Sequence, residues 1–404
     1  MLKFRQFSNP LNGKGGIVYV FGALLLFFAL YDGIISYLLP LVVTEHAISK
    51  TMLGMIFATA AVSGAFFDFA IYRIFKNAFY RRLFFAMFAA AAAYIFIIWS
   101  AELILLYFAA MAIWGFYYDL KSFGTLDFVS RYSEKKEISG NFGIIQSFQA
   151  VGYLLAPLIA GFLIIDIVDW QPFAAAVVFL VISALFFALL LVKAHGMKQH
   201  IPQHEKPRRG FAGELAGWKR AGSAMLPILF LGAFATVIDS FFMAIGPLLA
   251  ESMPIEPFDG IFMFAYYLPP LFMGGLVGLV ASRFGEKNTA LFGLLIGAAL
   301  LSLISFFSSP LAVVFIVFAS ACFTSMLLPI VQGTYARLIR KSPSQKKEIQ
   351  ELGDFASNFG YIIGPVAAGM IADALGNAAA FSVLGIAGIG AAAVLFATMP
   401  GTKK

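Results

Sequence analysis

The sequence predicts an all-α integral membrane protein of twelve transmembrane helices, arranged as two pseudo-symmetric six-helix bundles. Three observations predict this fold class: long uninterrupted apolar stretches, basic residues confined to alternate loops, and a pattern of residues that occurs twice. The 404 residues are 61% hydrophobic and 12% charged, whereas soluble domains are about 25% charged. The chain therefore has too few polar residues to cover the surface of soluble domains.

Many apolar stretches reach about 20 residues, enough for a helix to cross a hydrocarbon core of roughly 30 Å. They are continuous rather than alternating, which argues against an outer-membrane β-barrel. The expected spans are 17–43, 51–75, 81–100, 103–130, 140–165, 172–193, 223–250, 258–281, 289–308, 311–336, 350–373 and 377–398. Short connections make successive helices antiparallel.

The basic residues indicate the orientation in the membrane. Of the 28 Lys and Arg residues, all but Lys50 and Lys121 lie at the termini or around alternate loops. Basic loops stay cytoplasmic, so we expect a multi-pass protein of the cell (inner or plasma) membrane with both termini in the cytoplasm. No cleavable signal peptide is evident in the polar N-terminal arm. Topology accounts for the net charge of +7, so we expect no nucleic-acid partner.

One long polar segment divides the spans six and six. The expected units are an N-terminal bundle over 1–193, a cytoplasmic linker over 194–222 and a C-terminal bundle over 223–404. The linker contains three of the four histidines, but their spacing fits no standard set of metal ligands. We therefore expect no metal site. The stretch GFAGELAGWKR in the linker predicts a short amphipathic helix on the membrane surface.

An internal repeat relates the two halves. The stretch YDGIISYLLP at 31–40 matches IDSFFMAIGP at 238–247, and GYLLAPLIAG at 152–161 matches GYIIGPVAAG at 360–369. The offsets are 207 and 208 residues. The chain is therefore predicted to be a duplicated six-span unit. Such repeats are typical of secondary transporters, which bind their substrate near the bilayer midplane between the halves.

Six plus six spans, a basic central loop and these motifs together resemble the major facilitator superfamily over essentially the whole chain. GLVASRFGEK at 278–287 is similar to the family's cytoplasmic signature, with Ser282 in place of the usual acid. The resemblance implies a cytoplasmic gating motif made of Asp68, Arg73, Gly278, Ser282, Arg283, Gly285 and Lys287. The first half lacks the second glycine of the signature, and Asp68 takes part of the acid's role from about a turn deeper.

GYLLAPLIAG also resembles the fifth-helix motif of the family's proton antiporters, with Ala156 where glycine is usual. Small residues let helices approach closely in lipid, and proline permits a bend. The motif therefore has two interpretations, static packing and conformational change. The helix-bending and packing residues are Gly152, Ala156, Pro157 and Gly161, and in the repeat Gly360, Gly364, Pro365 and Gly369.

Four charged residues lie deep within expected spans: Asp32, Asp119, Lys121 and Asp239. A charge at the bilayer centre costs at least about 2.5–3.5 kcal/mol, so such residues face a cavity or a partner. The resemblance implies a central cavity lined by spans 1, 4, 7 and 10, and the four charges fall on three of these spans. We expect Lys121 to neutralise Asp32 or Asp119 through a water, or to bind an anionic substrate group. The alternatives are a structural ion pair and a lysine extending to the cytoplasmic side.

Polar and aromatic residues near these charges complete the expected cavity: Trp114, Tyr118 and Gln332. Aromatic rings beside acids suit a cationic ligand, whereas Tyr and Gln would equally suit a sugar. A carboxyl group withdrawn from water can be protonated near neutral pH. Asp32 is therefore interpreted as a proton site, a substrate site or both.

The leading functional hypothesis is a secondary active transporter that works by alternating access, as a proton-coupled antiporter exporting hydrophobic or cationic small molecules. One alternative is proton-coupled uptake of a sugar or organic acid, and another is a non-transporting membrane sensor or assembly protein of the same fold. No GxxxxGK[ST] loop occurs, so a gradient of protons or sodium must supply the energy. No catalytic constellation indicates an enzyme, no cofactor is expected, and the resemblance implies a monomer.

Overall fold

A computed structural model describes residues 14–46, 48–74, 79–134, 137–164, 167–195, 211–256 and 258–398. The side chains of some of these residues, among them 68–74 and 211–221, are outside that description. The helices are α1 (Lys14–Glu45), α2 (Lys50–Ile74), α3 (Tyr80–Ser100), α4 (Ile104–Tyr132), α5 (Ile138–Leu163), α6 (Trp170–Lys193), α7 (Phe211–Ser252), α8 (Ile261–Phe284), α9 (Glu286–Leu301), α10 (Pro310–Thr324), α11 (Leu327–Lys341), α12 (Lys346–Leu375) and α13 (Asn377–Thr398). Two short 3₁₀ turns, Ile304–Phe306 and Pro343–Gln345, complete the described structure.

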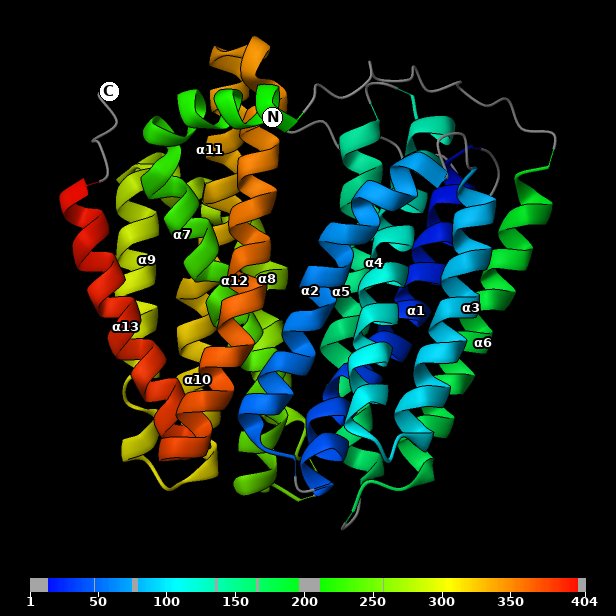
Figure 1. Cartoon of the computed structure of the whole chain (residues 1–404), viewed down its shortest axis with the longest axis horizontal. Coiled ribbons are helices and arrows are strands. Elements are labelled where there is room, and N and C mark those ends of the chain that lie inside the picture. Colours follow the sequence, from blue (N-terminus) through cyan, green and yellow to red (C-terminus); the bar gives the residue numbers. More distant parts are fainter. Residues whose placement is uncertain are drawn as a thin grey trace, which may run out of the picture.

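The helices form two groups, α1–α6 and α7–α13, with α2, α5, α8 and α12 between them (Figure 1). α1 packs chiefly against α5 and α6, and α7 packs chiefly against α12. These two central helices, α1 and α7, bury the largest share of their length. Both helices are apolar on nearly all sides, which is typical of a helix that other helices enclose.

Aromatic packing and internal hydrogen bonds fix α1 within the first group. Phe21 stacks on Phe128 of α4 with ring centroids 4.0 Å apart. The Tyr31 hydroxyl donates a hydrogen bond of 2.6 Å to the Ala91 carbonyl of α3, and the Ser183 hydroxyl of α6 donates one of 2.9 Å to the Leu24 carbonyl. In an apolar interior such polar side chains need partners. Three neighbouring helices therefore hold α1 in position and set the direction of Asp32.

Eleven helical segments of the described chain are long and apolar enough to cross a membrane by length and composition. The remaining span is α4, which carries Asp119 and Lys121. The expected tenth span, 311–336, is divided: α10 ends at Thr324 and α11 begins at Leu327. Pro329 has no N–H to bond to the Ser325 carbonyl, which accounts for a break one turn earlier.

The expected linker, 194–222, is partly helical. α7 begins at Phe211 and continues without interruption into the seventh span. The predicted helical stretch in the linker is therefore the first part of a long helix rather than a separate one. The remainder of the linker, 196–210, lies outside the described residues.

Charged residues differ between the two ends of the bundle. We call the end at which α1 begins and α13 ends the basic end, since Arg81, Arg131 and Lys193 lie there. The other end is the acidic end, where Glu45 and Glu251 lie. At the described helix ends, basic residues therefore gather at one end of the bundle and acidic residues at the other, as the alternation of basic and acidic loops in the sequence predicts.

The two groups touch at the acidic end. α2 and α12 lie side by side there and diverge toward the basic end (Figure 1). A Cβ on Gly54 of α2 would collide with the Pro365 carbonyl of α12, and one on Gly260, just before α8, would collide with the Pro157 carbonyl of α5. By contrast, a Cβ on Gly143 of α5 or Gly274 of α8, nearer the basic end, would meet nothing within 4 Å. The halves are thus closed at one end only.

A carboxylate strengthens this closure. Asp373, near the end of α12, accepts hydrogen bonds from the backbone N–H of Lys50 at 3.0 Å and of Thr51 at 2.8 Å, and from the Thr51 hydroxyl at 2.6 Å. These N–H groups belong to the first turn of α2, where a helix has unsatisfied donors and a positive dipole end. One half therefore caps a helix of the other.

Candidate functional site

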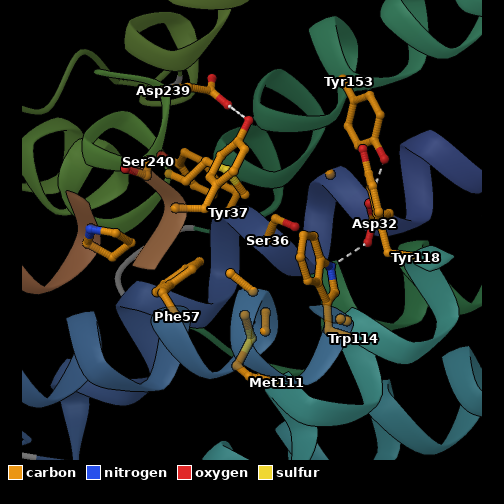
Figure 2. A pocket seen from close by; sticks show the side chains of 18 of the residues that line it. Asp32, Ser36, Tyr37, Phe57, Met111, Trp114, Tyr118, Tyr153, Asp239 and Ser240 are labelled. Carbon is orange, nitrogen blue, oxygen red and sulfur yellow. Dashed lines mark hydrogen bonds between the residues drawn. The ribbon is translucent and has the colours of Figure 1, made fainter. Parts of the chain in front are cut away.

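A cavity of about 340 Å³ lies between the two halves. Residues of α1, α2, α4, α5, α7, α8 and α12 line it. Most of the lining is apolar or aromatic, including Phe57, Met111 and Trp114 (Figure 2). Three carboxylates also line the cavity: Asp32, Asp119 and Asp239. A concave apolar surface with a few converging polar groups is typical of a small-molecule site.

Asp32 of α1 is 1% exposed and is surrounded by hydrogen-bond donors. Its Oδ1 accepts hydrogen bonds from Trp114 Nε1 at 2.9 Å and from the Tyr117 hydroxyl at 2.5 Å. Its Oδ2 accepts one of 2.6 Å from the Tyr153 hydroxyl of α5 (Figure 2). Hydrogen bonds to an ionised acceptor are short and strong. The three donors therefore replace the water that a carboxylate loses on burial.

Lys121 lies behind this group rather than in the cavity lining. Its side chain is 4% exposed, and its Nζ donates a hydrogen bond of 3.1 Å to the Tyr153 hydroxyl oxygen. The same Nζ lies 3.9 Å from the ring centroid of Tyr118, within the range of a cation–π contact. Lys121 therefore reaches Asp32 through the Tyr153 hydroxyl, where the sequence suggested a water.

Asp239 of α7 has a simpler environment. Its Oδ1 accepts a hydrogen bond of 2.9 Å from the Tyr266 hydroxyl of α8, and its Oδ2 accepts one of 2.7 Å from the Tyr361 hydroxyl of α12. Tyr266 is held by stacking on Phe242, with ring centroids 3.8 Å apart. Both tyrosines are neutral donors. Among the described residues, no ion pair joins Asp239 to a basic side chain.

The internal repeat explains these two sites. Tyr153 follows Gly152, and Tyr361 follows Gly360 at the matching place of the second half. A Cβ on Gly152 would lie 2.6 Å from the Leu26 carbonyl of α1, and one on Gly360 would lie 2.5 Å from the Ala233 carbonyl of α7. Each glycine therefore permits the close helix contact that brings the next residue, a tyrosine, to an aspartate.

The other residues of the glycine–proline motifs lie along the same contacts. Ala156 lies against Gly33 of α1, and Gly364 lies against Ser240 of α7. Toward the acidic end, a Cβ on Gly161 would collide with the backbone of Gly260, and one on Gly369 with that of Lys50. Together with Pro157 and Pro365, these residues join α5 to α8 and α12 to α2. The motif thus serves both the packing within each half and the contact between the halves.

Of the other expected cavity residues, Tyr118 is 43% exposed and lines the cavity, stacked on Trp114 with centroids 5.2 Å apart. Gln332 of α11 is exposed and is not among the lining residues. Sequence reasoning did not select Tyr153 or Tyr361 as site residues. The available signal was a tyrosine repeated directly after the first glycine of each motif.

The expected gating residues of the first half, Asp68 and Arg73, have side chains outside the described residues. In the second half, Gly285 has a φ of 81° and joins α8 to α9, a conformation that favours glycine. The Ser282 hydroxyl bonds to the Leu279 carbonyl of its own helix at 2.8 Å. Arg283 lies 5.7 Å from the ring centroid of Phe284. The remaining members, Gly278 and Lys287, lie in α8 and α9.

The sequence model of the Major Facilitator Superfamily matches residues 20–256 and 228–404. The chain belongs to the Major Facilitator Superfamily. Among curated proteins, none matches it. Its fold is a transporter fold of this superfamily, with twelve transmembrane helices in two pseudo-symmetric bundles, and the protein is therefore a multi-pass membrane protein.

Several solved structures share this superfamily fold. The peptide transporter POT in complex with sulfate is 13% identical, with a TM-score of 0.77 and coverage of 96% of both chains. The nucleoside transporter NupG is 15% identical, with a TM-score of 0.74 and coverage of 96% of this chain and 100% of its own. A bacterial homolog of the human lysosomal transporter Spinster, inward-facing and unoccupied, is 12% identical, with a TM-score of 0.74 and coverage of 96% and 97%. At these identities the likeness concerns the fold alone.

Proposed function

We propose that the protein is a secondary active transporter that exchanges hydrophobic or cationic small molecules for protons by alternating access. The observation that carries this proposal is the composition of the cavity wall. Its described lining includes three carboxylates and five tyrosines, and no Lys, Arg or His. Lys121, the one deeply buried lysine among the described side chains, is covered by Tyr118. A ligand in this cavity meets negative charge and aromatic faces, both of which attract a cation.

Carboxylates also suit proton coupling. A carboxylate in a closed apolar cavity is neutralised by a proton or by a bound cation, and a cavity that opens to the other side lets one replace the other. Basic loops stay cytoplasmic, so the closure at the acidic end corresponds to an inward-facing state. In this orientation the cavity would load its ligand from the cytoplasm, as an exporter does. The protein acts as a monomer in the cell membrane and requires no cofactor.

A second candidate is proton-coupled uptake of a hydroxyl-rich metabolite such as a sugar or nucleoside. Ser36, Ser240 and Asn358 line the cavity and offer neutral hydrogen-bonding groups. A nucleoside transporter is among the similar structures. The position of Lys121 disfavours an organic acid, since its ammonium group points to Tyr153 and not to the cavity.

Proton movement in proteoliposomes tests the proposal. The vesicles have an acidic lumen that contains a pH dye. Ethidium, uridine, glucose or lactate is added to the outside in separate experiments. Antiport predicts that ethidium, a permanently charged aromatic cation, releases protons from the lumen, and that the release is absent from empty vesicles. Proton entry together with uridine or glucose would establish uptake instead. A response that occurs only in a sodium gradient would mean that sodium, and not the proton, is the coupling ion. No response to any compound would favour a non-transporting protein.

A further inference from the structure

The two repeat-related carboxylates, Asp32 and Asp239, have different charge environments. Asp32 accepts three hydrogen bonds, and the Tyr153 hydroxyl connects it to the ammonium group of Lys121. Asp239 accepts two hydrogen bonds, both from tyrosine hydroxyls. Asp32 therefore has a positive charge in its hydrogen-bond network, and Asp239 has none among the described residues.

The sequence repeat explains the difference. Residues 124–125 and 333–334 are the same Gly-Thr pair in the two halves. By this alignment the position of Lys121 corresponds to Ile330 of α11, a buried apolar residue. The second half thus keeps the carboxylate and the tyrosine of the repeat but has isoleucine in place of the lysine. No basic side chain described in the second half balances the charge of Asp239.

The two carboxylates also differ in access. Asp32 is 1% exposed, whereas Asp239 is partly exposed. Both line the cavity, and Figure 2 shows them on opposite sides of it. A carboxylate in apolar surroundings without a positive partner is strongly unfavourable. A proton from the cavity, or a cation bound in it, removes that cost at Asp239.

We propose that Asp239 is the site at which a proton and the cationic group of the ligand replace each other, while Asp32 stays paired with Lys121 and shapes the wall. When the ligand binds, the O–H bond of the Asp239 carboxyl group breaks and its proton passes to cavity water. The ligand's positive group then pairs with the carboxylate. One positive charge enters the site as one leaves it. This assignment rests on the proposed function and specifies its exchanging group.

The groups around Asp239 are compatible with this exchange. Tyr266 and Tyr267 face it from α8, Tyr361 from α12 and Tyr118 from α4. The other two carboxylates of the cavity wall are Asp32 of α1 and Asp119 of α4. These tyrosines stay neutral over the physiological pH range, so none of them competes for the proton.

Among the side chains that the structure describes, the remaining helices packed against α7 add no charge beside the site. α13 has no titratable residue. On α11, Tyr335 lies against Gly232, two turns from Asp239 toward the basic end, and the arginines and lysine of that helix are in its last two turns. On α2, Lys50 lies at the acidic end, where its backbone N–H donates to Asp373.

Binding of ethidium to the purified protein, followed by fluorescence at pH 5 to 8, tests the assignment. A single competing proton weakens the apparent affinity by up to about tenfold per pH unit on the acidic side of the titration. We expect this slope in the wild type, with release of about one proton per ethidium in weakly buffered solution. Asp239→Asn should lose both the slope and the proton release, and Asp239→Glu should keep them.

The control is the double variant Asp32→Asn/Lys121→Met, which removes two balanced charges together. Because Asp32 lines the cavity, the affinity of this variant for ethidium should change, but we expect the slope and the proton release to remain. The assignment is overturned if the double variant loses them while Asp239→Asn, shown to be folded by its elution profile and melting temperature, keeps them. Failure of the proposed function is distinguishable, since the wild type itself would then show no ethidium-linked proton release.

Discussion

Tyr361 donates a hydrogen bond of 2.7 Å to Asp239 from the position directly after a glycine at which α12 touches α7. Tyr153 and Asp32 stand in the same relationship in the first half, at 2.6 Å. The duplicated unit therefore contains more than helices. It contains a glycine that lets two helices approach closely, a tyrosine that donates a hydrogen bond, and an aspartate that accepts it. The two halves differ in the residues that surround this unit, and these residues decide the charge environment of each aspartate in the cavity.

Replacing Tyr153 by Phe should uncouple Lys121 from Asp32, because one hydroxyl contacts both groups. We expect the free energy of unfolding to fall by about 1–2 kcal/mol, the range for a buried hydrogen bond to a charged group in a membrane protein. Thermal unfolding in detergent measures the change. Tyr361→Phe is the matched variant. It should lower the free energy of unfolding by less, because Asp239 can take up a proton when it loses the hydrogen bond. Equal losses in the two variants would contradict the difference in charge environment.

Lys121→Met should destabilise the protein by leaving Asp32 without its positive charge. Adding Asp32→Asn should recover much of the loss, because the pair is then removed as a whole. A double-mutant cycle should give a coupling energy of about 0.5–3 kcal/mol. Additive effects of the two substitutions would show that the Tyr153 hydroxyl carries no interaction between them.

Gly54→Val should open the acidic end. A Cβ at this position collides with the Pro365 carbonyl, and such overpacking costs about 1–3 kcal/mol. Spin labels at Ile167→Cys and Phe258→Cys, both exposed at that end, report the separation of the halves in a Cys322→Ser background. We expect longer distances to gain roughly tenfold in population. Gly274→Val, where a Cβ meets nothing within 4 Å, should leave the distances unchanged.

Asp373→Ala should weaken the same closure by removing the cap on the first turn of α2. Loss of an N-terminal cap costs about 0.5–2 kcal/mol, so the same spin labels should show a smaller shift to long distances than Gly54→Val. The control is Asp169→Ala, which removes a carboxylate that bonds Trp170 N–H within one half. This control should lower stability without changing the distances. A shift of equal size in both variants would mean that Asp373 has no specific role between the halves.

The sequence predicted most of the fold because its signals are repeated many times. Apolar runs, basic loops and a duplicated GY-x₃-P pattern all give the same topology. It could not predict the break before Leu327, because a proline in a helix can also be tolerated, as Pro40 is in α1. It did predict a helix over GFAGELAGWKR, but not that this helix continues into the seventh span as the first turns of α7, because these turns are polar and lie within the expected linker.

For the site, the sequence identified the deep charges but not their pairing. Asp119 and Lys121 are two residues apart and point to different sides of α4, so each had to find a partner on another helix. The contact between Lys121 and Tyr153 depends on how closely α5 approaches α1. The spacing of residues along one helix gives no information on the distance between two helices. Gln332 was expected in the cavity from its place on the tenth span. In the structure Gln332 is exposed on α11, beyond the break, and it is not in the described lining.

The proposed exchange of protons for cations in this cavity is one for one, and it can be measured as the ratio of the two fluxes. Ethidium movement and proton movement are recorded together in proteoliposomes, once with a pH gradient alone and once with a membrane potential alone. We expect about one proton per ethidium and transport driven by the pH gradient, with no net transport driven by the potential, because the exchange moves no net charge. Accumulation of ethidium driven by the potential alone, or a proton flux that does not depend on ethidium, would contradict it.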